Sequence, residues 1–429
     1  MPALPPTRQP DKAERANFPR VRFEIIRDPL WNNIRLDELA VSLIDTPVFQ
    51  RLRYVRQLGL AYLVYPGATH SRFEHALGTY HLARRTVSLL GERGELDGLA
   101  AEEPAIIYAA ALLHDIGHYP FSHALEEIGA LNHENVAEPL VTEGNVARLL
   151  SNRLGGDAPR RVYELITGKS NSPLQGLISG SLDLDKIEYL KRDALMCGVP
   201  YGEIDVDRLT NSMVLVSEPG STRKRIGVVE KALAALESLL FAKYQMYRNV
   251  YWHHTVRSAT AMYKRIVDDA LRANVLSSAE LGKFTDEGLL NRLESGPATL
   301  LASLRARRLY KRSLEWPGGS LDEGFGDWIA EDRDRVVALE NELALNAGLQ
   351  PGELLLDYPL KTQMLGLDLP VVRRNGKVEK LTDAGWKGAI NLPSLSKQLY
   401  LSTRWLRVFT ARKVELDREA VMSAIARPT

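Results

Sequence analysis

From Ala110 the chain reads Ala-Ala-Leu-Leu-His114-Asp115-Ile-Gly-His118-Tyr-Pro-Phe-Ser-His123, an apolar run that ends in an adjacent histidine and aspartate. The chain has nine histidines, and seven of them lie between His70 and His133. Imidazole and carboxylate groups from separate helical segments are typical of a metal held between helices. We therefore predict a metal centre whose ligands are His75, His114, Asp115 and Asp185.

The mixture of nitrogen and oxygen donors limits the metal only to a class. Two imidazoles and two carboxylates suit a divalent ion, and Mg, Mn, Fe, Co, Ni and Zn all remain open. Such a set leaves coordination positions free for water and for an oxygen of a substrate.

Two other interpretations compete with this metal centre. Single histidines are more often ordinary surface or packed residues, but the adjacent pair after a wholly apolar helix makes that reading unfavourable for the set. The outline His114-Asp115-Ile-Gly-His118 resembles the H-E-x-x-H of zinc peptidases. Its acid is aspartate, however, and Gly117 is expected to end the helix that would aim both imidazoles at one zinc.

Composition describes an ordinary globular protein. The 429 residues are 45% hydrophobic and 25% charged, with a formal net charge of +1, so charge alone favours neither nucleic acid nor a membrane surface. One cysteine, Cys197, excludes an intramolecular disulfide and suits a reducing compartment. No run is long enough to span a membrane, and the Pro- and charge-rich residues 1–20 do not form a signal peptide. We expect a cytoplasmic protein with a flexible N-terminal tail.

Periodicity and capping signals predict mostly helices. Ser71 and Glu74 form a capping box, which starts a helix at Arg72 that runs toward Leu90. Further helices are expected over 48–58, 105–116, 173–196 and 229–274, and charged helices to about Leu349. A hairpin is expected over 213–216 and 225–229, a second around Asn375-Gly376, and a strand over 405–410.

Several motifs of this sequence resemble those of a known enzyme family. The segments that carry the resemblance are Arg72-Phe73-Glu74-His75, His114-Asp115-Ile-Gly-His118-x-Pro-Phe-Ser-His123, His133-Glu134 and Asp185-Lys186-x-x-Tyr189-x-x-Arg192-Asp193. They resemble the HD-domain deoxynucleoside triphosphate triphosphohydrolases, in the branch of the human SAM-and-HD-domain enzyme and its bacterial relatives, over about residues 28–269. The resemblance implies cleavage of a dNTP into deoxynucleoside and inorganic triphosphate.

The resemblance also assigns roles to side chains. His123 resembles the general acid and Glu126 its positioning partner, where the human enzyme has Asp; His118 and His133 resemble phosphate-facing histidines. The implied substrate contacts are Gln57, Leu58, Arg72, Lys186, Tyr189, Asp193 and Arg248, with the cations at the triphosphate and Tyr189 under the sugar. A further tyrosine of the family aligns with Val256.

Nucleotide activation is implied less directly. Residues that resemble an activator site are Asp45, Gln50, Arg53, Arg307 and Lys311, although the basic run 305–312 would equally suit a solvated helix face. The family's Asn-Asp-Pro-Ile-His-Gly segment is Arg27-Asp28-Pro29-Leu30-Trp31-Asn32 here. Such sites lie between subunits, so we expect a homo-oligomer, a dimer or a tetramer.

The resulting expectation is a mostly α fold, with an HD-domain helical core, a small β-hairpin and a mixed α/β C-terminal region. We expect a tail at 1–20, a catalytic core at 21–275, and a C-terminal region at 276–429 with a regulatory or oligomerisation role. Two alternatives stay open: an HD phosphohydrolase acting on a nucleoside monophosphate, a cyclic nucleotide or single-stranded nucleic acid, and a non-catalytic nucleotide sensor.

Overall fold

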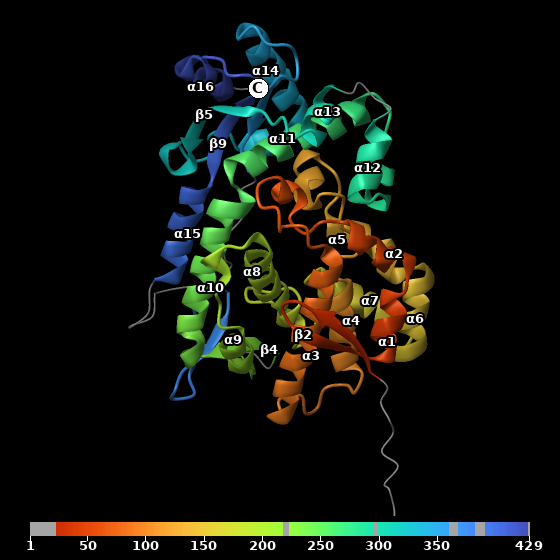
Figure 1. The fold of residues 1–429 in the computed structure, drawn as a ribbon. Helices are drawn as coiled ribbons and strands as arrows, with labels where there is room; N and C mark the ends of the chain where they lie inside the picture. Colours follow the sequence, from red (N-terminus) through yellow and green to blue (C-terminus); the bar gives the residue numbers. More distant parts are fainter. Residues whose placement is uncertain (1–22, 218–222, 295–298, 360–367, 382–390, 428–429) are drawn as a thin grey trace, which may run out of the picture.

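The computed structural model describes residues 23–217, 223–294, 299–359, 368–381 and 391–427. It is predominantly helical, with three small sheets and a mixed α/β C-terminal region, which confirms the expected fold class. In Figure 1 helices α1 to α7 gather on one side, and α8 lies between them and α10. The expected tail at 1–20 lies outside the described residues.

The N-terminal side begins with a hairpin of β1 (Glu24–Asp28) and β2 (Asn32–Leu36), followed by short helices α1 (Glu38–Ile44) and α2 (Pro47–Gln50). The predicted helix over 48–58 is wrong beyond residue 50, where a 3-10 turn (Arg51–Tyr54) follows. Helix α3 (Arg72–Glu92) starts at the predicted capping box of Ser71 and Glu74. Its first turn therefore carries His75.

Helix α4 (Glu103–Leu113) packs against α3 and is buried along most of its length. Apolar residues on all sides of this helix keep it in the centre of the core. It ends at Leu113, one turn earlier than predicted, with His114 as its C-terminal cap. Helices α5 (His133–Thr142), α6 (Gly144–Leu154) and α7 (Ala158–Ile166) complete this side.

Two long helices expected from the sequence are divided. The segment 173–196 contains only a 3-10 turn (Gln175–Leu177) before α8 (Leu184–Cys197), which starts where the side chain of Asp183 accepts a hydrogen bond from the Lys186 amide. The segment 229–274 forms α10 (Leu233–Met246), a π-helical turn (Tyr247–Tyr251) and α11 (His254–Arg272). Between α8 and α10 lie α9 (Val206–Ser212) and the predicted hairpin, β3 (Met213–Ser217) and β4 (Lys224–Val229).

The C-terminal part adds strands to the molecule. Strands β7 (Pro370–Val372) and β8 (Val378–Lys380) form the predicted hairpin at Asn375-Gly376, and β7 pairs in parallel with β4. Strand β9 (Trp405–Thr410), also predicted, lies between β5 (Lys311–Pro317) and β6 (Leu354–Asp357). The remaining helices are α12 (Asp286–Leu293), α13 (Thr299–Arg305), α14 (Arg333–Asn346), α15 (Leu392–Thr403) and α16 (Arg418–Ala426).

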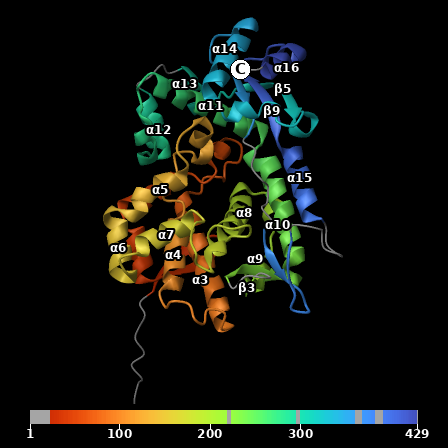
Figure 2. The ribbon, with the colours of Figure 1, turned by 180° about the vertical axis from the view of Figure 1, so that it is seen from behind.

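The prediction of charged helices through to Leu349 is wrong at β5. Helix α13 ends at Arg305, Arg307 has a left-handed backbone with φ 55°, and Lys311 opens β5. Arg307 and Lys311 therefore do not share a helix face. Figure 2 shows this C-terminal group of strands and helices at one end of the molecule, with α15 running beside α10. Among the described residues, no helix is both long and apolar enough to cross a membrane.

Candidate metal centre and active site

Three helices bring His75, His114 and Asp185 together. The ligand atoms of these residues lie within 4.8 Å of one another, although the residues are far apart in the sequence. His75 Nε2 is 3.1 Å from His114 Nε2 and 2.9 Å from Asp185 Oδ1. Three of the four predicted ligands therefore converge on one point.

The outer hydrogen bonds of the two histidines leave both Nε2 atoms free to bind a cation. His114 Nδ1 is 2.9 Å from the carbonyl of Ala111, which can only accept, so Nδ1 carries the hydrogen. His75 Nδ1 is 2.6 Å from the carboxylate of Glu188, which acts in the same way. When both imidazoles are neutral, two lone pairs and a carboxylate face one another, and a divalent cation satisfies all three. The residues present fit a metal ion.

Asp115 lies beside this group. Its Oδ2 is 3.6 Å from His75 Nε2 and its Oδ1 is 3.5 Å from His114 Nε2. Oδ2 also accepts a hydrogen bond of 2.5 Å from Arg72, and Oδ1 is 3.1 Å from His118 Nε2. Asp115 is therefore the side chain that joins the three-residue group to the next cluster.

The surroundings of the group favour positive charge at its centre. Burial lowers the pKa of His75, but hydrogen bonds with Asp185 and Glu188 outweigh burial and raise it to about 10. Burial raises the pKa of Asp185, but the hydrogen bonds with His114 and His75 hold it well below its ordinary value. Both shifts describe a pocket in which an anion is stable only beside a cation.

A second cluster is formed by His118, His123, Glu126 and His133, whose ligand atoms also lie within 4.8 Å of one another. Glu126 Oε1 is 2.8 Å from His133 Nδ1 and 3.4 Å from His123 Nδ1. The rings of His118 and His133 stack with centroids 3.8 Å apart. His123 is the open member, with 58% of its side chain exposed.

Charges differ across this second cluster. Burial, followed by the positive charge of Arg72, lowers the pKa of His118 well below its ordinary value, so this imidazole is neutral. Burial raises the pKa of Glu126, but its hydrogen bonds with His123 and His133 lower it further than burial raises it. Within the described residues, Nδ1 of the buried His118 has no hydrogen-bond partner and is available to a ligand.

The loop that carries the second cluster is held in an unusual conformation. Phe121 and Ser122 are consecutive non-glycine residues with φ 56° and 68°. Each such conformation costs about 1–3 kcal/mol and persists only where neighbours fix it. Here the Phe121 amide donates to Asp286 at 2.8 Å, Arg72 donates to the Ser122 hydroxyl, and the Tyr263 hydroxyl donates to the Pro120 carbonyl at 3.2 Å.

The predicted triphosphate cations take different positions. Lys186 donates to the carbonyl of Gly180 at 3.0 Å and to Asp183, and it lies at the same helix start as Asp185. Arg72 is buried and holds Asp115 and Ser122. Arg248 is exposed and donates to Tyr244 at 2.6 Å; within the described part of the chain it makes no hydrogen bond or ion pair with another predicted site residue.

Lys243 is a cation that the sequence analysis missed. It is only 5% exposed, and burial, followed by the charge of Lys186, lowers its pKa to about 8. The charges of Asp183 and Asp185 raise that pKa, so Lys243 is within electrostatic range of the start of α8, which packs against α10. A lone lysine in the apolar run Leu239-Leu240-Phe241-Ala242-Lys243 was the available signal.

The predicted sugar contacts meet through a histidine that the sequence analysis also missed. His70 Nε2 is 2.7 Å from Asp193 Oδ1, and the backbone N–H of Gln57 donates to the His70 backbone carbonyl at 3.0 Å. Gln57 Oε1 is buried and, among the described residues, has no partner. Leu58 follows Gln57 and packs against the core.

Tyr189 stands between the metal group and the sugar contacts. Its ring centroid is 6.4 Å from that of His75 and 6.4 Å from that of Tyr251. Tyr251, another missed residue, donates its hydroxyl to Asp193 at 2.7 Å. Val256, aligned with a family tyrosine, is instead a buried apolar residue near Leu58.

The residues that resemble an activator site lie at the surface. Arg53 donates to Gln50 at 2.8 Å and stacks on Phe73, while Asp45 is exposed at the end of α1. Arg307 donates to the carbonyl of Leu63 at 2.7 Å, and Lys311 is exposed. Within the described residues, no hydrogen bond or ion pair joins the 45–53 group to Arg307 or Lys311.

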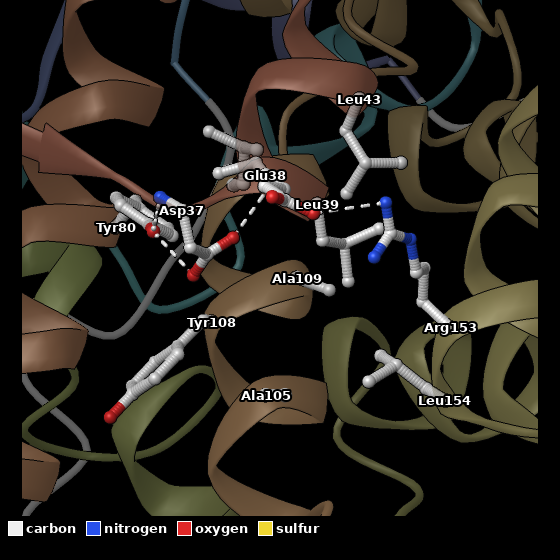
Figure 3. A pocket seen from close by; sticks show the side chains of 12 residues that line it. Asp37, Glu38, Leu39, Leu43, Tyr80, Ala105, Tyr108, Ala109, Arg153 and Leu154 are labelled. Atoms are coloured by element: carbon white, nitrogen blue, oxygen red, sulfur yellow. Dashed lines mark hydrogen bonds and ion pairs between the residues drawn. The ribbon is translucent and has the colours of Figure 1, made fainter. Parts of the chain in front are cut away.

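A cavity of about 310 Å³ lies elsewhere, between α1, α3, α4 and α6. Figure 3 shows Asp37 and Tyr80 on one side of this cavity and Arg153 and Leu154 on the other. The Glu38–Arg153 ion pair of 3.2 Å lies at its edge. None of the predicted site residues lines it, so we do not assign it to the active site.

Comparison with known families divides the chain into two matched segments. The HD domain family matches residues 72–180, which hold the first three predicted metal ligands and the second cluster. The HD associated region matches residues 204–385.

Comparison with individual proteins extends the likeness over most of the chain. An uncharacterized protein of Methanocaldococcus jannaschii is 35% identical over 322 residues, which are 74% of this chain and 66% of that protein. The chain spans about half to two thirds of the length of the first curated relatives that it matches.

Two further comparisons bear on fold and chemistry. The crystal structure of a hypothetical protein from Aquifex aeolicus is 27% identical, has a TM-score of 0.69, and covers 94% of this chain and 99% of its own. The human deoxynucleoside triphosphate triphosphohydrolase SAMHD1 is 47% identical over 104 residues, which are 24% of this chain and 17% of that protein.

Proposed function

The chain carries an HD domain followed by an HD associated region, a phosphohydrolase fold, and we propose on this basis that it hydrolyses deoxynucleoside triphosphates to deoxynucleoside and inorganic triphosphate. One observation carries the proposal. Asp115 connects the cation ligands His75, His114 and Asp185 to the second cluster, with 3.1 Å between Asp115 Oδ1 and His118 Nε2. That second cluster contains His123, an exposed histidine that can serve as a general acid.

The proposed reaction needs three contributions. His75, His114, Asp115 and Asp185 would hold a divalent cation, which when bound would supply Lewis acidity to activate water and to offset phosphate charge. Water attacks the α-phosphorus, and the bond from that phosphorus to the 5′ oxygen breaks. The leaving 5′ oxygen takes up a proton. We assign His123 as the donor of that proton, because it is the exposed histidine next to a carboxylate.

Glu126 then has a positioning role. It accepts from His133 at 2.8 Å and lies 3.4 Å from His123, so one carboxylate orients both rings. His118 and His133, stacked beside it, provide the wall against which the phosphates rest.

Lys186 and Lys243 are the cations that we propose for the triphosphate. Lys186 lies at the helix start that carries Asp185 and pairs with Asp183. Lys243 is buried and, among the described residues, has no carboxylate within ion-pair distance, so an anionic ligand would best compensate its charge. The resemblance gave Arg72, Lys186 and Arg248 as the triphosphate cations. We keep Lys186, and we propose Lys243 in place of Arg248.

The sugar pocket that we propose is built from Gln57, Tyr189 and Asp193. The unpaired Oε1 of Gln57 would accept from the 3′ hydroxyl, and its burial makes that hydrogen bond valuable. Tyr189, next to His75, would pack under the 2′ carbon and exclude a ribose hydroxyl. Discrimination of this kind makes a ribonucleotide a poorer substrate than the matching deoxyribonucleotide.

Product analysis tests the proposal. Metal-loaded protein is incubated with each dNTP and each NTP, and the products are separated by anion-exchange chromatography. Formation of deoxynucleoside and triphosphate from dNTPs is expected. Release of monophosphate and pyrophosphate would mean that the bond between the α- and β-phosphates breaks instead of the bond to the 5′ oxygen. Release of free phosphate would place the cleavage at the γ-phosphate, and either result would contradict the proposal.

Activation by nucleotide is a separate part of the proposal. Asp45, Arg53, Arg307 and Lys311 are exposed in one chain, which suits a site completed by a second subunit. We expect dGTP to raise turnover of the other dNTPs and to shift the protein to a larger homo-oligomer in light scattering. Equal rates and equal mass with and without dGTP would contradict this part alone.

A further inference from the structure

The side of His75 that points away from the metal group faces a buried carboxylate. Glu188 is fully buried, and its Oε2 is 2.6 Å from His75 Nδ1. We propose that Glu188 is a positioning residue for the metal centre, acting through His75. As a pure hydrogen-bond acceptor it keeps the hydrogen on Nδ1, so that the lone pair of Nε2 faces Asp185 and His114.

The other oxygen of Glu188 is fixed by two donors, one from the distant β1–β2 turn and one from the next turn of α8 itself. Oε1 accepts from Trp31 Nε1 at 2.9 Å and from Arg192 Nε at 2.8 Å. Arg192 Nη1 in turn donates to Asp28 at 3.0 Å, and Asp28 accepts from the Trp31 amide at 2.8 Å. The turn between β1 and β2 thus reaches the metal ligand through a closed set of hydrogen bonds.

Helix α3 leaves room for this arrangement at Gly78, three residues after His75. A Cβ on Gly78 would lie 1.9 Å from Glu188 Oε1 and 2.8 Å from Trp31 Nε1. Any side chain at position 78 would therefore displace both groups. The helix that presents the ligand also makes the space for the carboxylate that orients it.

Trp31, which stands where the family segment has His, donates directly to Glu188, and Asp28 acts on Glu188 through Arg192. Both residues thereby support His75. This inference rests on the proposed metal centre but not on the identity of the substrate.

The test measures metal affinity, which needs no nucleotide. Glu188→Gln is nearly isosteric, but its amide can present NH₂ to His75, and the ring must then accept at Nδ1 and carry its hydrogen on Nε2. We expect binding of Mn²⁺ and Co²⁺, measured by calorimetry on metal-stripped protein, to weaken about 10–100-fold. The Co²⁺ absorption spectrum should change as well, because one ligand is lost.

Glu164→Gln is the matched control. Glu164 is also paired with an arginine one helical turn away, with 3.1 Å between Arg160 Nε and Glu164 Oε1. It lies in α7, a helix that carries none of the proposed metal ligands. Its Mn²⁺ affinity should equal that of the unmodified protein. A weakening equal to that of Glu188→Gln would mean a general loss of stability and overturn the inference.

Trp31→Phe provides a second variant if Glu188→Gln does not fold. It removes one donor to Glu188 and keeps an aromatic ring, so affinity should fall about 2–10-fold by the loss of one outer hydrogen bond. Unchanged affinity in the folded variants, with the unmodified protein binding metal, overturns this inference. Failure of the unmodified protein to bind any metal instead overturns the proposed function.

Discussion

Removal of Asp286 should show how the loop that carries His123 is held. This aspartate is the first residue of α12 and is 1% exposed. It accepts from the Phe121 amide at 2.8 Å, from the Arg56 amide at 3.0 Å and from the Arg56 guanidinium at 3.2 Å. It therefore joins the loop before Gln57 to the left-handed pair Phe121-Ser122.

Asp286→Ala leaves two backbone N–H groups without an acceptor, each at a cost of about 1–3 kcal/mol, so we expect a loss of about 3–5 kcal/mol in the free energy of unfolding. For 429 residues with an unfolding entropy of roughly 2 cal/mol/K each, the melting temperature should fall by about 3–5 °C. Release of the left-handed pair also moves His123, and displacement of a catalytic group by about 1 Å lowers kcat/KM by about 10²-fold. Asp286→Asn keeps one acceptor oxygen and should fall between the two proteins.

Asp334→Ala is the control for this prediction. Asp334 also lies in the first turn of a helix and pairs with an arginine, Arg272, at 2.6 Å, but its side chain is 86% exposed. Its removal should change the free energy of unfolding by less than about 1 kcal/mol and leave kcat/KM unchanged. Thermal unfolding and initial rates measure both. If Asp286→Ala behaves like Asp334→Ala, the loop is not held by α12 and the reasoning fails.

Three further predictions concern the chemistry. His123→Ala should lower kcat about 10²–10⁴-fold, because the proton donor is lost. KM and the melting temperature should change little, because the side chain is exposed and makes few packing contacts. An unaltered kcat would contradict the assignment of His123 as the acid. KM for a dNTP should rise as the pH rises through about 8, because Lys243 loses its charge there. Lys243→Arg should abolish that rise, whereas Arg248→Ala should leave it in place. A KM that does not change with pH contradicts the assignment of Lys243. Chelation of the metal should lower the melting temperature by about 3 °C relative to protein in Mn²⁺ at 100 times its Kd, about 2.7 kcal/mol of linkage, and His114→Ala should show no such difference.

Local signals predicted the elements of this fold well where capping or turn chemistry was present. The capping box at Ser71 and Glu74 located the start of α3, and Asn375-Gly376 located a hairpin whose glycine has φ 82°. The apolar pattern did not reveal the π-helical turn at 247–251. A single π turn adds only about one residue to a helical turn, so the spacing of apolar residues still resembles that of a continuous helix. Nor did it reveal the late start of α8, which depends on the side chain of Asp183 as a cap.

Some residues of the candidate site could be predicted from the sequence and others could not. Its histidines and acids could be named from their types and order, since few other arrangements use them together. Lys243 could not, because a lysine in an apolar helix gains meaning only when the fold places Lys186 and Asp185 beside it. Glu188 could not either, since its partner Trp31 lies 157 residues away in the sequence. Contacts of this range are set by packing and have no local pattern.

The placement of the metal is tested most directly by anomalous diffraction from crystals grown with Mn²⁺. The account predicts one strong peak per chain, about 2.0–2.3 Å from His75 Nε2, His114 Nε2 and one oxygen each of Asp115 and Asp185. A peak that leaves out Asp185, or the absence of any peak at His75 and His114 in Mn²⁺-loaded crystals, would contradict it.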